Sequence, residues 1–394
     1  MKPTEFVKVN SQFWGDHLRG VSEHLPTSHA RELPGPLLYP RLMVLTETPD
    51  WNILELVGVS REYRSLEVRR QKAASIDQYF GGGESAAAGP VVVLPNESAF
   101  KDATITSERG RSVLGTRFPG AQSLIGNELV GTGDAGTGKL LKFAPGNYTS
   151  FDRVLLVHEA NSSVRIHWTF LAIAIHRSEP AEKYRDYLQS LVNTAPHLDP
   201  LGTLSVPRGE VEQVLKGDAF ASTYLMHGIQ DTTVGEFLNQ HEDVLLSAFD
   251  ATRLIHEPFL EWRDGAAHAD EIAINPDFIL ERADGSHIIG DLRLPLLETA
   301  NVTKGKKRRR SFTAPVPDGL AQLAHYEEYF QTPENRAFAK AKYGIEVSEP
   351  RKLLVIGSQE NVDPTEFEQA AQSTTSFEIV DYDSILRLHL AAKS

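Results

Sequence analysis

The residues best suited to chemistry lie in the stretch NPDFILERADGSHIIGDLRLP (275–295), whose pattern predicts a β-hairpin. Its tip, ADG, favours a three-residue loop with Gly285 in the left-handed region. That loop fixes the register of the two strands and sets Asp277 opposite Asp291. Opposed residues share one face of a hairpin, and Arg293, two residues beyond Asp291, points to the same face. The hairpin therefore brings three charged groups together.

Two carboxylates at this spacing, with about 5 Å between their Cβ atoms, repel each other unless a cation lies between them. A hard divalent ion such as Mg²⁺ meets that need with oxygen ligands. The alternative is that Asp277 and Asp291 lie at exposed strand ends, with Arg293 as a simple counter-ion. Gln322 and Tyr326, in QLAHY, share one face of a predicted helix. They favour the metal site, because this helix should pack over the hairpin.

Other motifs fit known sites less well. GDAGTGKL (133–140) nearly matches the phosphate-binding loop GxxxxGK[ST], but Leu140 cannot bind magnesium as a hydroxyl does. An NTP-driven protein that uses Lys139 is the weaker alternative that this motif leaves open. GGGESAAAG (81–89) has Ala87 where a nucleophile elbow, GxSxG, requires glycine, so we expect a loop. HEDVL and HEPFL both lack the second histidine of a zinc-binding HExxH helix.

The charged residues include one strongly basic run. The net charge of −13 argues against a general coat for nucleic acid, although a local patch can still bind DNA. KGKKRRR holds six basic residues in seven. It fits a solvated loop, a contact with a phosphate backbone, or a nuclear localisation signal. The candidate DNA-binding residues are Lys304, Lys306, Lys307, Arg308, Arg309 and Arg310.

The length of 394 residues predicts two domains, and we place their boundary near residue 215. This gives an N-terminal domain of unknown role, 1–215, and a C-terminal domain, 216–394. The sequence contains no apolar run long enough to span a membrane, and its N-terminus lacks the features of a secretory signal. The absence of cysteine excludes disulfides and cysteine-ligated zinc, and it fits a reducing cytoplasm. We therefore expect a cytoplasmic protein.

Hydrophobic patterning predicts an α/β protein with a β-rich α+β N-terminal domain. Strands are expected within 53–70 and 152–175, and a helix at 179–194. The C-terminal half is predicted to contain helices at 232–248, 318–331, 334–343, 364–372 and 383–392, strands at 253–262, 351–358 and 377–381, and the hairpin. Without the short helix at 334–343, its core order is α-β-β-β-α-β.

These motifs together resemble the PD-(D/E)xK nuclease superfamily. Pro276–Asp277, Asp291–Arg293 and the QxxxY pair occur in the matching order within the expected core. Over about residues 232–358 the sequence is similar to the Shedu family of prokaryotic anti-phage defence proteins. The resemblance implies a metal-dependent DNA endonuclease that uses Mg²⁺ or Mn²⁺, often forms homo-oligomers, and carries varied N-terminal domains.

The sequence departs from the pattern of the superfamily at two positions. Arg293 replaces the usual lysine, and arginine cannot act as a base, since its pKa is above about 12. It can still position water and stabilise negative charge if the metal activates the water. Lys304 or Lys306 is the alternative source of a mobile amine. For the acid expected on the first core helix, the candidates are Glu236, which we prefer, and Glu242.

The resemblance implies a role for each candidate residue. The expected metal ligands are Asp277, Asp291, the Leu292 carbonyl and Glu236. We expect Arg293 to stabilise the transition state, Gln322 to orient the water or Arg293, and Tyr326 to contact the DNA backbone. The alternative is a module of the same fold that has lost catalysis and only binds or senses DNA.

Overall fold

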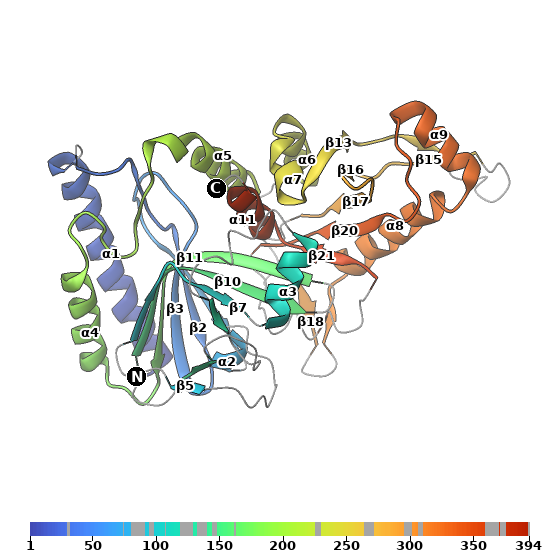
Figure 1. The fold of residues 1–394 in the computed structure, drawn as a ribbon. Coiled ribbons are helices and arrows are strands. Elements are labelled where there is room, and N and C mark those ends of the chain that lie inside the picture. The colour runs from blue at the N-terminus through green and yellow to red at the C-terminus, as the bar shows by residue number, and fades with distance from the viewer. Residues whose placement is uncertain are drawn as a thin grey trace. The chain divides into compact units, whose positions relative to one another are not determined.

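The computed structural model shows a mixed α/β protein with several sheets (Figure 1). The chain forms two compact units: unit 1 is Met1–Ser112, Leu124–His158 and Ile166–Ala221, and unit 2 is Val113–Ser123, Glu159–Arg165 and Ser222–Ser394. No helix in the described part of the chain is long and apolar enough to cross a membrane. The structure describes all residues except 30–31, 74, 80–90, 94–97, 107, 119–128, 132–139, 144–147, 161–162, 225–229, 264–271, 295–301, 306–309, 359–369, 371–375 and 393–394.

The N-terminal half consists of helices separated by groups of mostly short strands. In chain order they are α1 (Pro3–Ser28), β1 (Leu37–Leu38), β2 (Leu42–Glu47), β3 (Trp51–Val57), β4 (Glu67–Lys72), α2 (Ile76–Tyr79), β5 (Val91–Val93), β6 (Ser98–Lys101), β7 (Thr104–Thr106), α3 (Glu108–Arg117), β8 (Leu129–Gly131), β9 (Leu140–Lys142), β10 (Tyr148–Ala160), β11 (Ser163–His176), α4 (Ala181–Thr194), β12 (Leu204–Ser205), a 3₁₀ turn (Arg208–Glu210) and α5 (Val211–Tyr224).

Unit 1 is built on a sheet in which β4, β2, β3, β11, β10, β7 and β8 lie in that order. The strands predicted within 152–175 and the helix predicted at 179–194 are confirmed as β10, β11 and α4. The long helix α1 was not predicted. Phe6, Trp14 and Leu18 are buried along it at helical spacing, so the signal was present in the sequence. The helices α1 and α4 lie side by side (Figure 1), and α1 also contacts β2 and β3.

Unit 2 contains the remaining elements. They are α6 (Asp231–Gln240), α7 (Asp243–Ala248), β13 (Ala251–His256), β14 (Leu260–Glu261), β15 (Ala273–Ile274), β16 (Phe278–Arg282), β17 (His287–Leu292), β18 (Thr303–Lys304), β19 (Ser311–Phe312), α8 (Pro315–Tyr329), α9 (Pro333–Tyr343), β20 (Arg351–Val355), β21 (Glu378–Val380) and α11 (Tyr382–Ala392).

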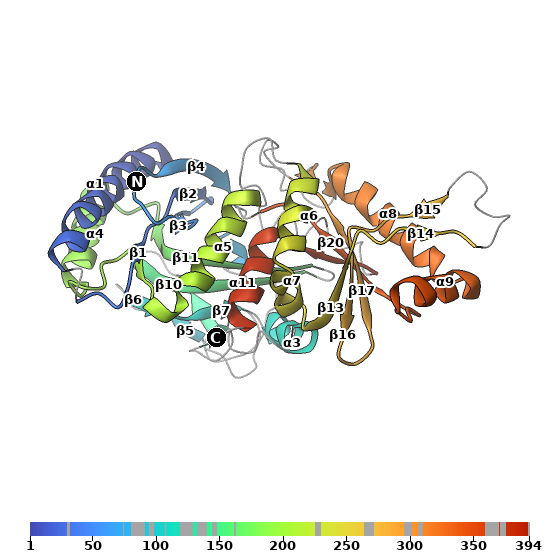
Figure 2. The same cartoon turned by 90° about the horizontal axis from the view of Figure 1, so that it is seen from above.

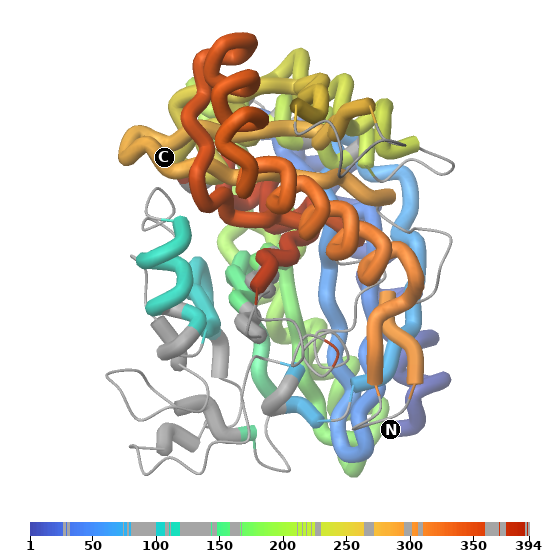
Figure 3. Tube along the Cα trace, turned by 90° about the vertical axis from the view of Figure 1, so that its right-hand side faces the viewer, coloured from blue at the N-terminus to red at the C-terminus, as the bar shows by residue number. Residues whose placement is uncertain are grey.

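The sheet of unit 2 has the order β13-β16-β17-β20-β21. The first three strands are antiparallel to one another, whereas β17, β20 and β21 are parallel. The helices α6 and α7 lie on one side of the β13–β16–β17 strands and α8 on the other (Figure 2). The strands β18 and β19 pair with each other, and the chain continues from β19 into α8 (Figure 3). Leaving out the short paired strands and α9, the chain runs from α6 and α7 through β13, β16, β17 and α8 to β20.

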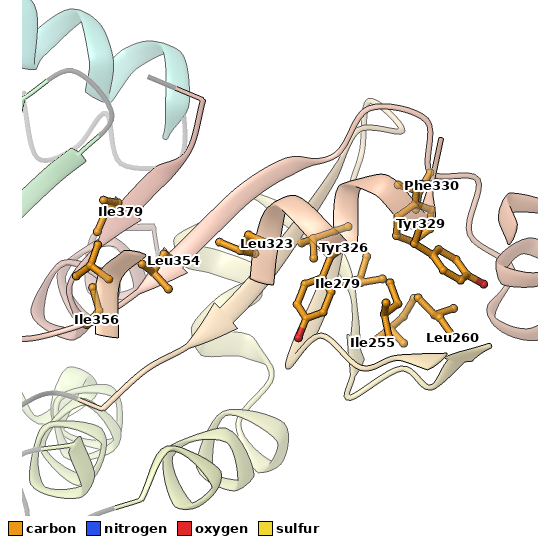
Figure 4. Close-up of a cluster of buried hydrophobic side chains, with 14 of the residues drawn as sticks. Ile255, Leu260, Ile279, Leu323, Tyr326, Tyr329, Phe330, Leu354, Ile356 and Ile379 are labelled. Atoms are coloured by element: carbon orange, nitrogen blue, oxygen red, sulfur yellow. The ribbon is translucent and has the colours of Figure 1, made fainter. Parts of the chain in front are cut away.

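A hydrophobic core fills the space between the sheet and α8. Leu323, Tyr326 and Tyr329 of α8 pack toward Ile279 and Leu354 of the sheet (Figure 4). All five side chains are at most 3% exposed. This packing fixes the helix over the strands that carry the candidate aspartates.

The predicted hairpin is confirmed in its turn and its register. Gly285 has a φ of +80°, and Phe278 pairs with Gly290 and Ile279 with Ile289, as the three-residue loop requires. Gly290 is needed because a Cβ there would lie 1.9 Å from the Cζ atom of Phe278. The pairing of these strands ends at Phe278 and Gly290, so Asp277 and Asp291 lie directly beyond this pair.

Two predicted elements differ from the structure. The helix expected at 232–248 is two helices, because His241 leaves the helical conformation with φ −124° and ψ 58°. The strand expected at 253–262 ends at His256, because Glu257 turns the chain with a φ of +42° and Pro258 cannot donate to a ladder. The helix predicted at 364–372 lies almost wholly outside the described residues.

Candidate active site

Asp277 stands immediately before β16 and is held from two sides. Its Oδ2 atom accepts a hydrogen bond of 2.5 Å from the Leu292 backbone N–H. Its backbone carbonyl accepts one of 2.9 Å from the N–H of Glu257. The carboxyl group of Asp277 therefore lies against the end of β17. The Leu292 side chain is buried, and its N–H is the group that Asp277 engages.

Asp291 lies near the end of β17 and forms an ion pair with Arg293. The distance from Arg293 Nε to Asp291 Oδ2 is 2.6 Å, and the Asp291 side chain is only 5% exposed. Neither of these two atoms makes a well-aligned hydrogen bond, so the contact is a charge–charge interaction at short distance. A buried carboxylate in this position has spare capacity to bind a cation.

The helix α8 adds a chain of polar contacts to this pair. The Arg293 Nη2 group donates to Gln322 Oε1, and the Gln322 amide donates to the Tyr326 hydroxyl. Tyr326 in turn donates to the Asn275 carbonyl over 3.2 Å. The structure therefore brings Gln322 and Tyr326 together with Asp291 and Arg293. The expected contact of Tyr326 with DNA is not favoured, because this side chain is 3% exposed and its hydroxyl is occupied.

Close packing leaves no space between α8 and the ion pair at Gly319. A Cβ atom at Gly319 would lie 3.2 Å from Arg293 Nε and 3.3 Å from Asp291 Oδ2. An added Cβ would require these charged groups or α8 to move by a few tenths of an ångström. The positions of Asp291 and Arg293 thus depend on how α8 is seated.

Burial strongly shifts the titration of both aspartates. Desolvation raises the pKa of Asp291 to about 7; the nearby Asp277 charge adds to this, and Arg293 opposes it. Desolvation also raises the pKa of Asp277 to about 6, against the hydrogen bond from Leu292. Desolvation and mutual repulsion therefore favour the neutral forms of these carboxyls even beside Arg293, and a further cation would favour their charged forms.

Two further acids act on this pair, and sequence reasoning missed both. The charge of Asp231, the first residue of α6, raises the pKa values of Asp277 and Asp291. Glu257 acts in the same direction on the pKa of Asp277. Glu236, our preferred helix acid, is instead exposed farther along α6. Asp231 stood one residue before the predicted helix, where an acid is ordinarily explained as favourable to the helix dipole.

Glu242 and the basic residues lie away from this site or outside the described residues. Glu242 is exposed just before α7. Lys304 is exposed on β18 and pairs with Ser311, and Arg310 is half-buried. The segment 306–309, together with the motif at 81–89 and Lys139 of the phosphate-loop-like motif, falls outside the described residues.

The donor set at Asp277 and Asp291 fits a hard divalent cation. Across the described part of the chain, no three His, Asp or Glu side chains are placed to hold a metal together. Mg²⁺ commonly binds through one or two carboxylates and keeps several waters, so a carboxylate pair suffices for it. Asp291 is buried and Asp277 is half-buried, and desolvation raises the pKa values of both carboxyl groups.

No profile of a known protein family matches this sequence. No curated protein is significantly similar to it.

Proposed function

We propose that this protein is a metal-dependent endodeoxyribonuclease of the PD-(D/E)xK type, which hydrolyses phosphodiester bonds in foreign DNA such as phage DNA. The observation that carries the proposal is one polar cluster on the α8 face of the hairpin. In it Arg293 contacts both Asp291 and Gln322 of α8, while Asp277 accepts a hydrogen bond from the Leu292 N–H beside Arg293. The order of α6, α7, β13, β16, β17, α8 and β20 supports it, because the resemblance implies the same order.

In this proposal Asp277 and Asp291 hold Mg²⁺ or Mn²⁺. When bound, the ion would supply a water of lowered pKa and positive charge at the phosphate. Arg293 binds a phosphate oxygen and offsets the negative charge that develops on it. Gln322 orients the Arg293 guanidinium, and the Tyr326 hydroxyl holds the Gln322 amide. Asp231 adds negative charge that strengthens cation binding.

The alternative function is a nuclease-like module that binds or senses DNA without cutting it. The ion pair between Arg293 and Asp291 favours this alternative, because it places a permanent cation beside the carboxylate that the metal would need. Metal affinity separates the two functions. A module without catalysis needs no divalent ion at Asp277 and Asp291.

The proposal is tested by calorimetric titration of Mn²⁺ into the metal-free protein. We expect binding by the wild type and loss of binding in Asp277→Asn and in Asp291→Asn. Asp284→Asn is the matched control, because Asp284 belongs to the same hairpin but is exposed at its tip. Equal Mn²⁺ binding by all four proteins would place the metal elsewhere and remove the basis of the proposal.

The partners of this nuclease follow from the same resemblance. We propose double-stranded DNA, bound in part through the basic segment 304–310, as the substrate. We further propose that the protein works as a homo-oligomer in the cytoplasm. Light scattering coupled to size-exclusion chromatography tests the oligomer: a monomer at micromolar concentration would contradict it.

A further inference from the structure

Tyr382, the first residue of α11, reaches the candidate site from outside the predicted motifs. Its hydroxyl donates a hydrogen bond of 2.7 Å to the backbone carbonyl of Arg293. We propose that Tyr382 is a positioning residue that sets where the Arg293 guanidinium lies. The inference rests on the proposed nuclease function, and its test is chosen so that it can be judged separately.

Arg293 is the first residue beyond β17 and needs support that the strand no longer provides. Its N–H donates to the Val355 carbonyl over 2.8 Å, which continues the parallel pairing with β20 by one bond. Its carbonyl accepts from Tyr382. Asp291 and Gln322 then engage the side chain. The backbone N–H, the carbonyl and the guanidinium of Arg293 are thus all held, and Tyr382 supplies the contact to the carbonyl from the C-terminal helix.

Tyr382 is itself fixed by its surroundings. The side chain is 0% exposed, and its ring stacks on Tyr224 with a centroid distance of 5.4 Å and an interplanar angle of 18°. The Tyr382 N–H donates to the Gly357 carbonyl over 3.1 Å. Tyr224, the last residue of α5, donates from its hydroxyl to Asp383 over 2.9 Å. The two stacked rings and these hydrogen bonds allow Tyr382 little freedom.

The first turn of α11 is also locked. The Ser384 N–H donates to Asp381 Oδ1 over 2.8 Å, and the Ser384 hydroxyl donates to the same oxygen. This side-chain cap satisfies a backbone donor at the start of the helix. Because the cap fixes the first turn of α11, it also fixes the Tyr382 hydroxyl, and this hydroxyl in turn fixes the backbone carbonyl of Arg293.

Tyr382→Phe removes the hydroxyl and leaves the stacked ring in place. Arg293 then loses the bond that fixes its carbonyl, and its guanidinium is free to shift relative to Asp291 and Gln322. Small displacements of a group that acts in the transition state lower the rate more than they lower substrate affinity. For DNA cleavage we expect kcat to fall roughly tenfold with little change in KM.

The matched control is Tyr329→Phe. Tyr329 is equally buried and donates a hydrogen bond of 3.0 Å to the Glu261 carbonyl, away from Arg293. The direct readout is the Nε–Hε signal of Arg293 in protein labelled with ¹⁵N-arginine, assigned by its loss in Arg293→Lys. We expect this signal to shift or broaden in Tyr382→Phe and to stay unchanged in Tyr329→Phe.

The outcomes separate the inference from the proposed function. An unmoved Arg293 signal in Tyr382→Phe overturns the positioning role, and so does an equal shift in both variants. A fall in kcat that is the same in both variants also overturns it, because it would show a general loss of packing. If the wild type cuts no DNA, the proposed function fails, while the spectrum still decides whether Tyr382 positions Arg293.

Discussion

Replacing Gly319 with alanine tests how tightly α8 is packed against the candidate site. The new Cβ would lie 2.6 Å from Leu354 Cδ1, 3.2 Å from Arg293 Nε and 3.3 Å from Asp291 Oδ2. Leu354 is fully buried, so its methyl group has little room to move. The other two atoms belong to the ion pair. The added methyl group must therefore disturb the core, the ion pair or both.

The magnitude follows from two opposing effects. Alanine is favoured over glycine inside a helix by about 0.5–1 kcal/mol, whereas overpacking a core costs about 1–3 kcal/mol. For Gly319→Ala we expect the free energy of unfolding to fall by up to roughly 2.5 kcal/mol. Gly235→Ala in α6 is the matched control, because its Cβ would meet His256 and Leu292 at an ordinary 3.7 Å. There we expect only the gain of about 0.5–1 kcal/mol.

Thermal unfolding of both variants beside the wild type measures this difference. For a unit of this size, 1 kcal/mol corresponds to about 2–4 °C in Tm. We expect Tm to fall in Gly319→Ala and to rise in Gly235→Ala, and DNA cleavage to weaken only in Gly319→Ala. An equal rise in Tm for both variants would refute the close packing of α8 against Asp291 and Arg293.

Three further predictions concern charge. Because burial raises the pKa values of Asp277 and Asp291 from 3.8 to about 6 and about 7, the metal-free folded state binds more protons than the unfolded state between about pH 4 and 7. Its free energy of unfolding should therefore fall as pH rises through this window. In Asp277→Asn the loss of unfolding free energy between about pH 4 and 7 should be smaller by at most about 3 kcal/mol, measured by urea unfolding in EDTA. An unchanged pH profile would contradict the raised pKa of Asp277. Asp231→Asn should weaken Mn²⁺ binding in calorimetry about tenfold, whereas Glu236→Gln should not; the reverse would restore Glu236 as the helix acid. Neutralising 306–310 should make the slope of log K against log salt for DNA binding shallower by about 0.9 for each phosphate that the segment neutralises in the wild type. An unaltered slope would exclude this segment from the interface.

Local chemistry made the hairpin predictable from sequence. The ADG tip favours a three-residue loop, Gly285 adopts the expected left-handed conformation, and the register of the paired strands follows from it. The juxtaposition of Gln322 and Tyr326 was equally predictable from sequence, because two residues four apart on a helix share a face. Such inferences need only backbone periodicity and the preferences of a turn.

Contacts between distant segments were not predictable in this way. Asp231 and Tyr382 lie far from the hairpin in sequence, and only the tertiary packing of α6 and α11 brings them to the site. The break at His241 carries no glycine or proline that would mark it. Glu257 has a left-handed conformation that glutamate rarely adopts, and the hydrogen bond to the Asp277 carbonyl accompanies it. These features depend on tertiary structure that no periodicity encodes.

Cleavage of supercoiled plasmid tests the central claim most directly. Purified wild-type protein and Asp291→Ala are incubated with plasmid in Mg²⁺ or Mn²⁺ and with EDTA, and the products are separated on a gel. We predict relaxed or linear DNA from the wild type with metal, and intact plasmid from Asp291→Ala and from the EDTA lanes. Intact plasmid in every lane, or cleavage that persists in Asp291→Ala, would contradict a metal-dependent nuclease at this site.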